Sequence, residues 1–168
     1  MDSATLRDLQ APLRDRYRQD PAAAVTALGA TGTFAGDGVT CTVAGFAGPV
    51  RAGLHPATGG DGTDACSGDL LLEAVLACAG VTLRSVATAM GVDLGSVTLR
   101  ADAVFDARGT LGLDSSVPVG IADLVVSVEL TGDVEDAALE RLARSTERYC
   151  VVGQSLREPP RVVVRRAT

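Results

Sequence analysis

The sequence is poor in aromatic residues and in histidine. Aromatic residues make up 3% of its 168 residues, tryptophan is absent, and His55 is the only histidine. Hydrophobic residues still reach 46%, so we expect an ordered globular domain whose core is mainly Val, Leu and Ala. With one histidine and no CxxC motif, the sequence predicts no zinc site. We expect no other metal and no bound cofactor.

The sequence also lacks the basic patches of nucleic-acid-binding proteins. Its formal net charge is −6 and its pI is about 4.7. Its cations are arginines concentrated near the two ends of the chain, a pattern typical of solvated helix faces and a basic tail. Because phosphate binding requires clustered cations, we expect no nucleic-acid partner.

One apolar run, from Leu70 to Met90, is long enough to raise the question of a membrane span. Glu73 and Arg84 lie inside this run and Asp69 precedes it, so a buried helix is the better interpretation. The first twenty residues are charged and lack the apolar region of a secretory signal. We therefore expect a cytoplasmic protein without a membrane partner.

The first third of the chain combines a helical extension with short strands. In residues 1–28, apolar residues recur at steps of three and four and predict an amphipathic helix that ends before Pro21. Residues 31–54 alternate and predict three strands, with turns at Gly36–Asp37–Gly38 and Gly48–Pro49. The loop that follows has too few apolar residues to predict an element.

A long helix follows, with Ser67 as its predicted N-cap and Gly91 near its end. It is apolar on nearly every face, which is typical of a helix surrounded by protein. Strands are then predicted in residues 96–107, 121–130 and 161–166, and a helix in residues 133–149. Strands and helices come in blocks, so the pattern favours a single α+β domain over a doubly wound sheet.

The chain has four cysteines, which a reducing cytosol should keep out of structural disulfides. Cys78 lies in the middle of the long helix, where a cysteine is either a small hydrophobe or, beside a group that stabilises its thiolate, a reactive thiol. Cys150 ends the last helix next to Gly153, so we expect it to be the more accessible of the two. Cys41, in a strand, is expected to be a packing residue.

The segments around Cys78 and Cys150 resemble the OsmC/Ohr family of organic hydroperoxide reductases. SGDLLLEAVLACAGVTLRSVATAMG is similar to the family's central helix, which carries the first cysteine in an apolar context. RYCVVGQSL is similar to its second-cysteine segment. The order of elements also agrees, and the resemblance covers residues 30–166.

The resemblance implies a thiol-dependent peroxidase that reduces organic hydroperoxides. Cys78 would be the peroxidatic thiolate, Cys150 would resolve it to a disulfide, and an external dithiol, for example of lipoyl type, would reduce that disulfide. The family folds as an intertwined homodimer, with antiparallel sheets around a buried central helix and active sites at the subunit interface. A small organic hydroperoxide would be the substrate.

The chain departs from the family pattern at the groups that support the thiolate. The family's glutamate stands ten residues before the first cysteine, a position held here by Gly68, with Asp69 one place along. Arg51 is the candidate for the supporting arginine. Val151 replaces the proline that usually follows the second cysteine. These departures leave a small-ligand-binding or redox-sensing protein as the alternative function.

The roles of two residues in the loop before the long helix remain undecided. Cys66 is either an alternative resolving thiol or a tolerated loop cysteine. His55 either lines the mouth of a pocket or is incidental. The glycine-rich loop that holds them precedes a helix, but it has neither GxGxxG nor GK[ST], so we expect no nucleotide site.

Overall fold

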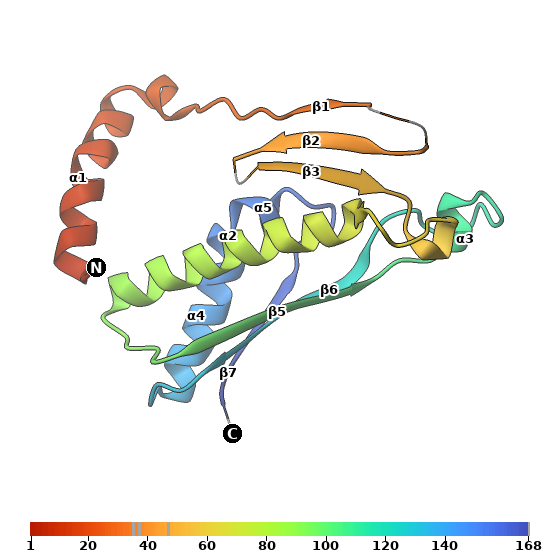
Figure 1. Ribbon diagram of the computed structural model, residues 1–168. Helices are drawn as coiled ribbons and strands as arrows, with labels where there is room; N and C mark the ends of the chain where they lie inside the picture. The colour runs from red at the N-terminus through yellow and green to blue at the C-terminus, as the bar shows by residue number, and fades with distance from the viewer. Residues whose placement is uncertain (35, 37, 47, 168) are drawn as a thin grey trace. The chain divides into compact units, whose positions relative to one another are not determined.

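The computed structural model describes residues 1–34, 36, 38–46 and 48–167 (Figure 1). The chain divides into two compact units, each assembled from separate stretches of sequence. The first unit holds residues 1–27, 75–101 and 125–168, and the second holds residues 28–74 and 102–124. Three long elements contribute residues to both units: helix α2 and strands β5 and β6.

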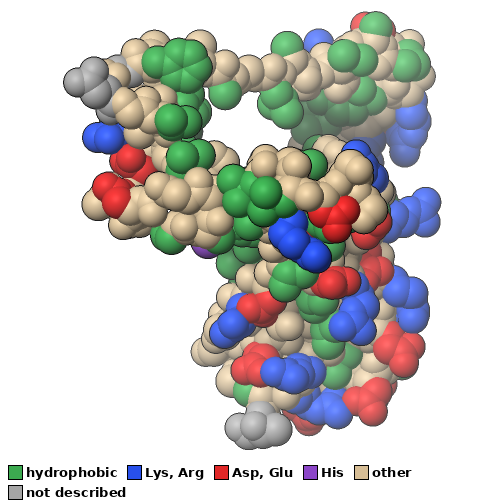
Figure 2. All heavy atoms as spheres, turned by 90° about the vertical axis from the view of Figure 1, so that its right-hand side faces the viewer, with side chains coloured by type: hydrophobic (Ala, Val, Ile, Leu, Met, Phe, Trp, Pro, Cys, Tyr) green, Lys and Arg blue, Asp and Glu red, His purple; other side chains and the backbone are tan. Residues whose placement is uncertain are grey.

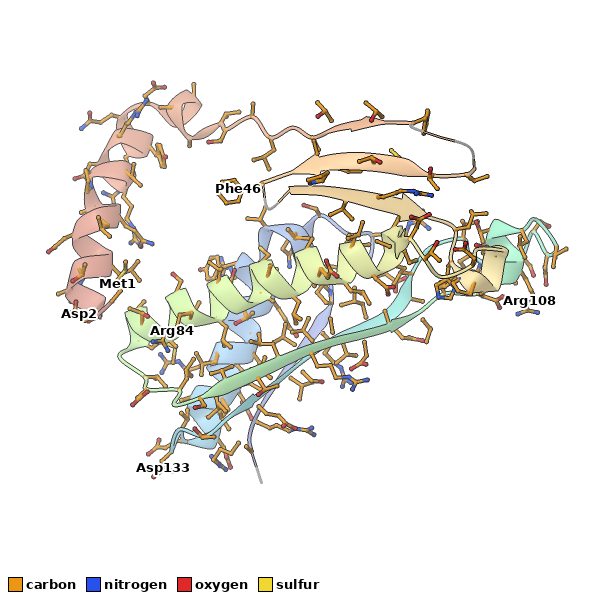
Figure 3. All side chains as sticks on the ribbon, viewed as in Figure 1. Met1, Asp2, Phe46, Arg84, Arg108 and Asp133 are labelled. Carbon is orange, nitrogen blue, oxygen red and sulfur yellow. The ribbon has the colours of Figure 1, made fainter. Side chains whose placement is uncertain are left out.

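The second unit is built on a four-stranded sheet in the order β1-β2-β3-β4 (Figure 1). Strands β1, β2 and β3 are antiparallel neighbours, and the two-residue strand β4 pairs with β3 in parallel. The strands are β1 (Thr31–Thr33), β2 (Cys41–Gly45), β3 (Gly48–Gly53) and β4 (Ala65–Cys66), with the short helices η2 (Pro56–Thr58) and α3 (Ala107–Thr110). Arg108 of α3, labelled in Figure 3, forms an ion pair with Asp106.

The first unit combines helices with a three-stranded sheet in the order β5-β6-β7, in which β6 and β7 are parallel. Its elements are α1 (Ser3–Gln19), η1 (Pro21–Ala24), α2 (Ser67–Met90), β5 (Val97–Val104), β6 (Ala122–Leu130), α4 (Asp136–Tyr149), α5 (Val151–Gln154) and β7 (Arg161–Arg166). The α+β class that the sequence predicts is therefore confirmed.

The core of the first unit follows the two periodicities of its sequence. In β6, every second residue is fully buried: Val126, Val128 and Leu130. In α4, which packs against β7, Leu139 and Leu142 lie on the buried face. Truncating Leu142 to alanine would leave a cavity that costs about 2–5 kcal/mol.

Helix α2 has 24 residues, but only one of its faces is buried. The buried residues are Val75, Ala79, Leu83 and Ala87, each one turn after the last. Val81, on another face, is 73% exposed. Burial on nearly every face, which the sequence predicts, is therefore not reached within one chain. The helix is long and apolar enough to span a membrane, a property that the core helices of soluble proteins share.

Charged residues of both signs intermingle on the surface shown in Figure 2. Arg166 pairs with Asp136 at 2.6 Å and Arg144 pairs with Glu140 at 3.2 Å. Such exposed pairs contribute about 0–1 kcal/mol each, so they solubilise the surface more than they stabilise the fold.

Most predicted elements are present, with shifts at their ends. Helix α4 begins at Asp136, three residues later than predicted. The β2–β3 register pairs Gly45 with Gly48 and Ala44 with Pro49, so Gly48 and Pro49 lie within β3 rather than in a turn. Strand β4 and helix η2, both in the glycine-rich loop, were not predicted. Asp37, in the other predicted turn, lies outside the described residues.

Candidate functional site

Cys78 and Cys150 come together in the first unit, although 71 residues separate them in the sequence. Cys78 lies near the middle of α2, and Cys150 is the residue between α4 and α5. At Cys150 the backbone leaves the helical region, with φ −72° and ψ 102°, so the helix breaks there and restarts as α5.

The break fixes the position of Cys150. Its N–H donates to the carbonyl of Thr146 at 3.0 Å, as the last hydrogen bond of α4. Its Sγ accepts the N–H of Gly153 at 3.4 Å, as an N-cap of α5. Both hydrogen bonds are local, so the position of this thiol follows from the helix break itself.

Four hydrogen-bond donors act on the Cys78 sulfur. Burial opposes ionisation of this thiol, but the donors outweigh it and hold the pKa of Cys78 below its ordinary value. In order of effect they are the N–H of Val152, the thiol of Cys150, the N–H of Val151 and the hydroxyl of Thr82. None of these four groups carries a formal charge of its own.

The pKa of Cys150 shifts in the opposite direction. Burial raises the pKa of the Cys150 thiol, and its hydrogen bond to the Cys78 thiolate raises it further, against the N–H of Gly153, which lowers it. Cys150 is 1% exposed, whereas Cys78 is half-buried. The expectation that Cys150 would be the more accessible thiol is therefore wrong, because it is packed against α5.

The two thiols thus form an asymmetric pair. Cys78 is the group that ionises first, and Cys150 keeps its proton and donates it in a hydrogen bond to the Cys78 sulfur. The thiolate is the nucleophilic form of cysteine. The arrangement is therefore suited to attack by Cys78, followed by disulfide formation with a thiol that is already in contact.

Two contributors to this site escaped the sequence analysis. Thr82 lies four residues after Cys78, on the same face of α2, and this i,i+4 spacing was a usable signal. The backbone donors gave no such signal, because every residue except proline has an N–H. At Val151 this exception matters, because the family's usual proline would have removed one donor to Cys78.

The two supporting residues predicted for the site both belong to the second unit. Arg51, on β3, forms an ion pair with Asp64, with 3.0 Å between Nε and Oδ1. Asp69, in the first turn of α2, lines a cavity of about 170 Å³. Arg84, the arginine of α2 labelled in Figure 3, is exposed.

The cavity beside Asp69 is also lined by the two loop residues whose roles the sequence does not decide. Cys66, His55 and Gly68 line it together with Phe105. The His55 ring packs edge-on against Phe105, with 5.2 Å between centroids, and its Nδ1 accepts the N–H of Ala57 at 3.0 Å. His55 therefore lines a pocket, which is one of the two alternatives that the sequence allows for it.

No group of three His, Cys, Asp or Glu side chains suited to a metal ion occurs among the residues that the structure describes. The four cysteines are free thiols. The chemistry available at the Cys78–Cys150 pair is accordingly that of two thiols.

An α+β fold with a thiol pair between its long helix and a later helix break defines a class of small thiol proteins. The chain belongs to the OsmC-like protein family, which matches residues 60–165, more than half of the sequence. The resemblance found in the sequence is thereby confirmed. A search of curated proteins finds no match to this chain.

Solved structures share the fold at low sequence identity. An organic hydroperoxide resistance protein from Elizabethkingia anophelis is 16% identical, with a TM-score of 0.67, over 86% of this chain and 99% of that one. An organic hydroperoxide resistance protein OsmC from Legionella pneumophila is 17% identical, with a TM-score of 0.63, over 86% and 100%. An OsmC-like protein from Mycoplasma pneumoniae is 12% identical, with a TM-score of 0.66, over 84% and 96%.

Proposed function

We propose that this protein is a thiol-dependent peroxidase that reduces organic hydroperoxides with Cys78 and Cys150. The observation that carries the proposal is the asymmetric pair, in which Cys78 is the favoured thiolate and Cys150 donates to it. Membership of the OsmC-like family supports a peroxide-related role. So does the fold shared with two organic hydroperoxide resistance proteins.

In the first step the Cys78 thiolate attacks the terminal oxygen of the hydroperoxide. An S–O bond forms and the O–O bond breaks, so the sulfur loses two electrons and the peroxide gains them. The alkoxide that leaves takes a proton from water and departs as an alcohol. Cys78 becomes a sulfenic acid.

In the second step Cys150 attacks the Cys78 sulfur. An S–S bond forms and the S–O bond breaks, and the hydroxide leaves as water with the proton of the Cys150 thiol. An external dithiol, for example of lipoyl type, then reduces the disulfide by exchange and is itself oxidised to a disulfide. Both cysteines return to thiols, so the cycle is balanced without a bound cofactor.

We also propose that the protein acts as a homodimer. Helix α2 is apolar on nearly every face but is buried along one stripe only, and Phe46 and Val81 are exposed (Phe46 is labelled in Figure 3). Apolar surface of this kind is stabilised by a partner. A second copy of the chain fits because the same helix supplies matching apolar faces.

A homodimer would also account for Asp69. It is nine residues before Cys78 on α2, which is about 14 Å along the axis of one helix, too far for contact with that thiol. A carboxylate that supports Cys78 would therefore come from the second copy. Arg51 is the arginine that we propose to support the thiolate with it.

We place the protein in the cytoplasm, because its chemistry requires a compartment that returns the thiols to the reduced state. Four free thiols, two of them in hydrogen-bonding contact, are compatible with such a compartment. Neither a nucleic acid nor a membrane has a part in this proposal.

The alternative is a redox sensor or small-ligand-binding protein with the same thiol pair. The observation that favours it is Gly68, which stands where the family has a glutamate and lines the cavity with Cys66. A sensor would form the disulfide without rapid turnover. A binding protein would leave both thiols reduced.

The test is the consumption of tert-butyl hydroperoxide in the presence of excess dihydrolipoamide. Multiple turnovers are expected from the unchanged protein and none above background from Cys78→Ser, with Cys41→Ser as the matched control at full rate. Cys78→Ser acting at the parental rate would contradict the peroxidase. A single stoichiometric oxidation without turnover would favour the sensor.

A further inference from the structure

Gly153, the third residue of α5, is buried against the thiol site. A Cβ added at this position would lie 3.1 Å from both Cγ and Cδ of Pro160 and 3.3 Å from the Sγ of Cys150. The N–H of the same residue donates to that sulfur at 3.4 Å. The Cys150 sulfur therefore lies directly against the bare backbone of Gly153.

The glycine is not required by the backbone conformation. Eight other glycines have a φ in the positive region, where a side chain is strained, and Gly153 is not among them. What Gly153 provides is space. An alanine would keep the same backbone and the same N–H, and would add only the methyl group.

The proline ring on the other side of this space, that of Pro160, is held in place by the fold. Pro160 is buried, and two residues later the N–H of Val162 donates to Oε1 of Glu147 at 2.8 Å. Glu147 lies on α4, one turn before Cys150. This bond ties the segment that carries the proline ring to the helix that carries the thiol, so the ring cannot move away from residue 153 without straining it.

We propose that Gly153 is a positioning residue for Cys150, whose missing side chain holds open the place from which the Cys150 thiol reaches the Cys78 sulfur. This inference rests on the proposed function, in which Cys150 resolves the oxidised Cys78. A methyl group at residue 153 displaces the Cys150 sulfur by a few tenths of an ångström. Attack by Cys78 on the peroxide does not need that position, whereas disulfide formation does.

The test compares Gly153→Ala with Gly120→Ala, in a background where Cys41 and Cys66 are serine. Gly120 is the matched control, because a Cβ there would have nothing within 4 Å. Rapid mixing with tert-butyl hydroperoxide separates the appearance of the sulfenic acid from its conversion to the disulfide. At a pH at which Cys78 is ionised in both variants, we expect the first rate to change less than twofold in Gly153→Ala and the second to fall about tenfold, since sub-ångström misplacement is costly in such steps.

A second readout uses the reduced protein and needs no peroxide. The alkylation of Cys78 by iodoacetamide is followed against pH. Displacement of Cys150 weakens its hydrogen bond to the Cys78 sulfur, so the alkylation profile of Gly153→Ala should move to higher pH. A role limited to folding would leave the profile of the folded protein in place.

The double variant Gly153→Ala/Pro160→Ala removes the proline ring and should recover most of the lost rate. If Gly153→Ala does not fold, the variant Pro160→Ala alone tests the inference. Loss of the proline ring beside Cys150 should speed the alkylation of that thiol. Parental disulfide formation and an unchanged pH profile in Gly153→Ala would overturn the inference. Failure of the unchanged protein to form the disulfide would instead overturn the proposed function, and the alkylation profile would still decide the role of Gly153.

Discussion

Two cysteine regions of this chain differ in what surrounds the sulfur. At Cys78, two amides, a thiol and a hydroxyl point at the sulfur and hold the pKa of the thiol low against burial. Cys66, by contrast, lines a cavity whose wall includes a histidine and a carboxylate. The donors to Cys78 are thus uncharged groups, whereas a histidine and a carboxylate line the cavity with Cys66. Hydrogen-bond donors, two of them backbone amides, therefore distinguish Cys78, the nucleophile that we propose.

The largest effect is expected at Cys150, the resolving thiol of the proposed mechanism. Cys150→Ser should still be oxidised at Cys78 by one equivalent of hydroperoxide, because the attack needs only the thiolate. It should form no Cys78–Cys150 disulfide, and turnover with a dithiol should fall at least tenfold, because the sulfenic acid is left without its resolving partner. Trapping with dimedone and mass spectrometry would measure the accumulated sulfenic acid.

Cys41→Ser is the control for that variant, because it removes a thiol outside the pair. If Cys150→Ser still yields a disulfide that contains Cys78, then Cys66 or a second chain supplies the resolving thiol, and the comparison between the two regions breaks down.

The next effect tests the backbone donors. Val151→Pro removes the N–H that Val151 donates to Cys78, at the first position of α5, where proline fits a helix. The pKa of Cys78 should rise, so less thiolate is present at neutral pH. One hydrogen bond to a charged group is worth about 1.5 kcal/mol, so oxidation should slow by about tenfold.

Val151→Ala keeps the N–H and should behave as the parent. The pH dependence of oxidation separates the two variants: its rise should lie at higher pH in Val151→Pro only. Equal profiles for the two would mean that this amide does not stabilise the thiolate.

A smaller effect is expected at Thr82, whose hydroxyl ranks below the other three donors to Cys78. Thr82→Val removes the hydroxyl at nearly constant shape and should raise the pKa of Cys78 slightly. The oxidation rate near neutral pH should drop by about two- to fivefold, the effect of a weak hydrogen bond. Thr82→Ser should retain the parental rate. A fall in Thr82→Ser as large as in Thr82→Val would assign the effect to packing.

The smallest effect is expected at Cys66, beside the cavity. Cys66→Ser removes the thiol beside the cavity, and both oxidation of Cys78 and disulfide formation should stay within about twofold of the parent, the range of a change away from the reacting groups. A larger loss, measured by stopped-flow oxidation, would make Cys66 part of the mechanism.

The sequence predicted what depends on periodicity and local chemistry. Strand β6 and helix α4 are present as expected, because the buried face of each is set by residues close in the chain. The pairing of Cys78 with Cys150 came from a family resemblance, and the hydrogen-bond contacts support it. Strand β4 was missed, since two residues held by pairing with β3 have no periodicity to detect.

The burial of Cys150 could not be predicted, because it depends on contacts between distant residues. Pro160 reaches Gly153 only after the chain turns back toward α4, and this closes the space around the sulfur. The donors to Cys78 were also hidden, because a backbone N–H reveals its direction only when the helix break at Cys150 is known.

The central claim is that Cys78 and Cys150 form an asymmetric pair, and site-resolved alkylation tests it most directly. The reduced protein is treated with iodoacetamide across a range of pH, and mass spectrometry reports the rate at each cysteine. Cys78 should react with a midpoint below that of free cysteine, and Cys150 with a midpoint above it, in keeping with the opposite shifts of their pKa values. The same midpoint at both thiols, or the lower one at Cys150, would contradict the account.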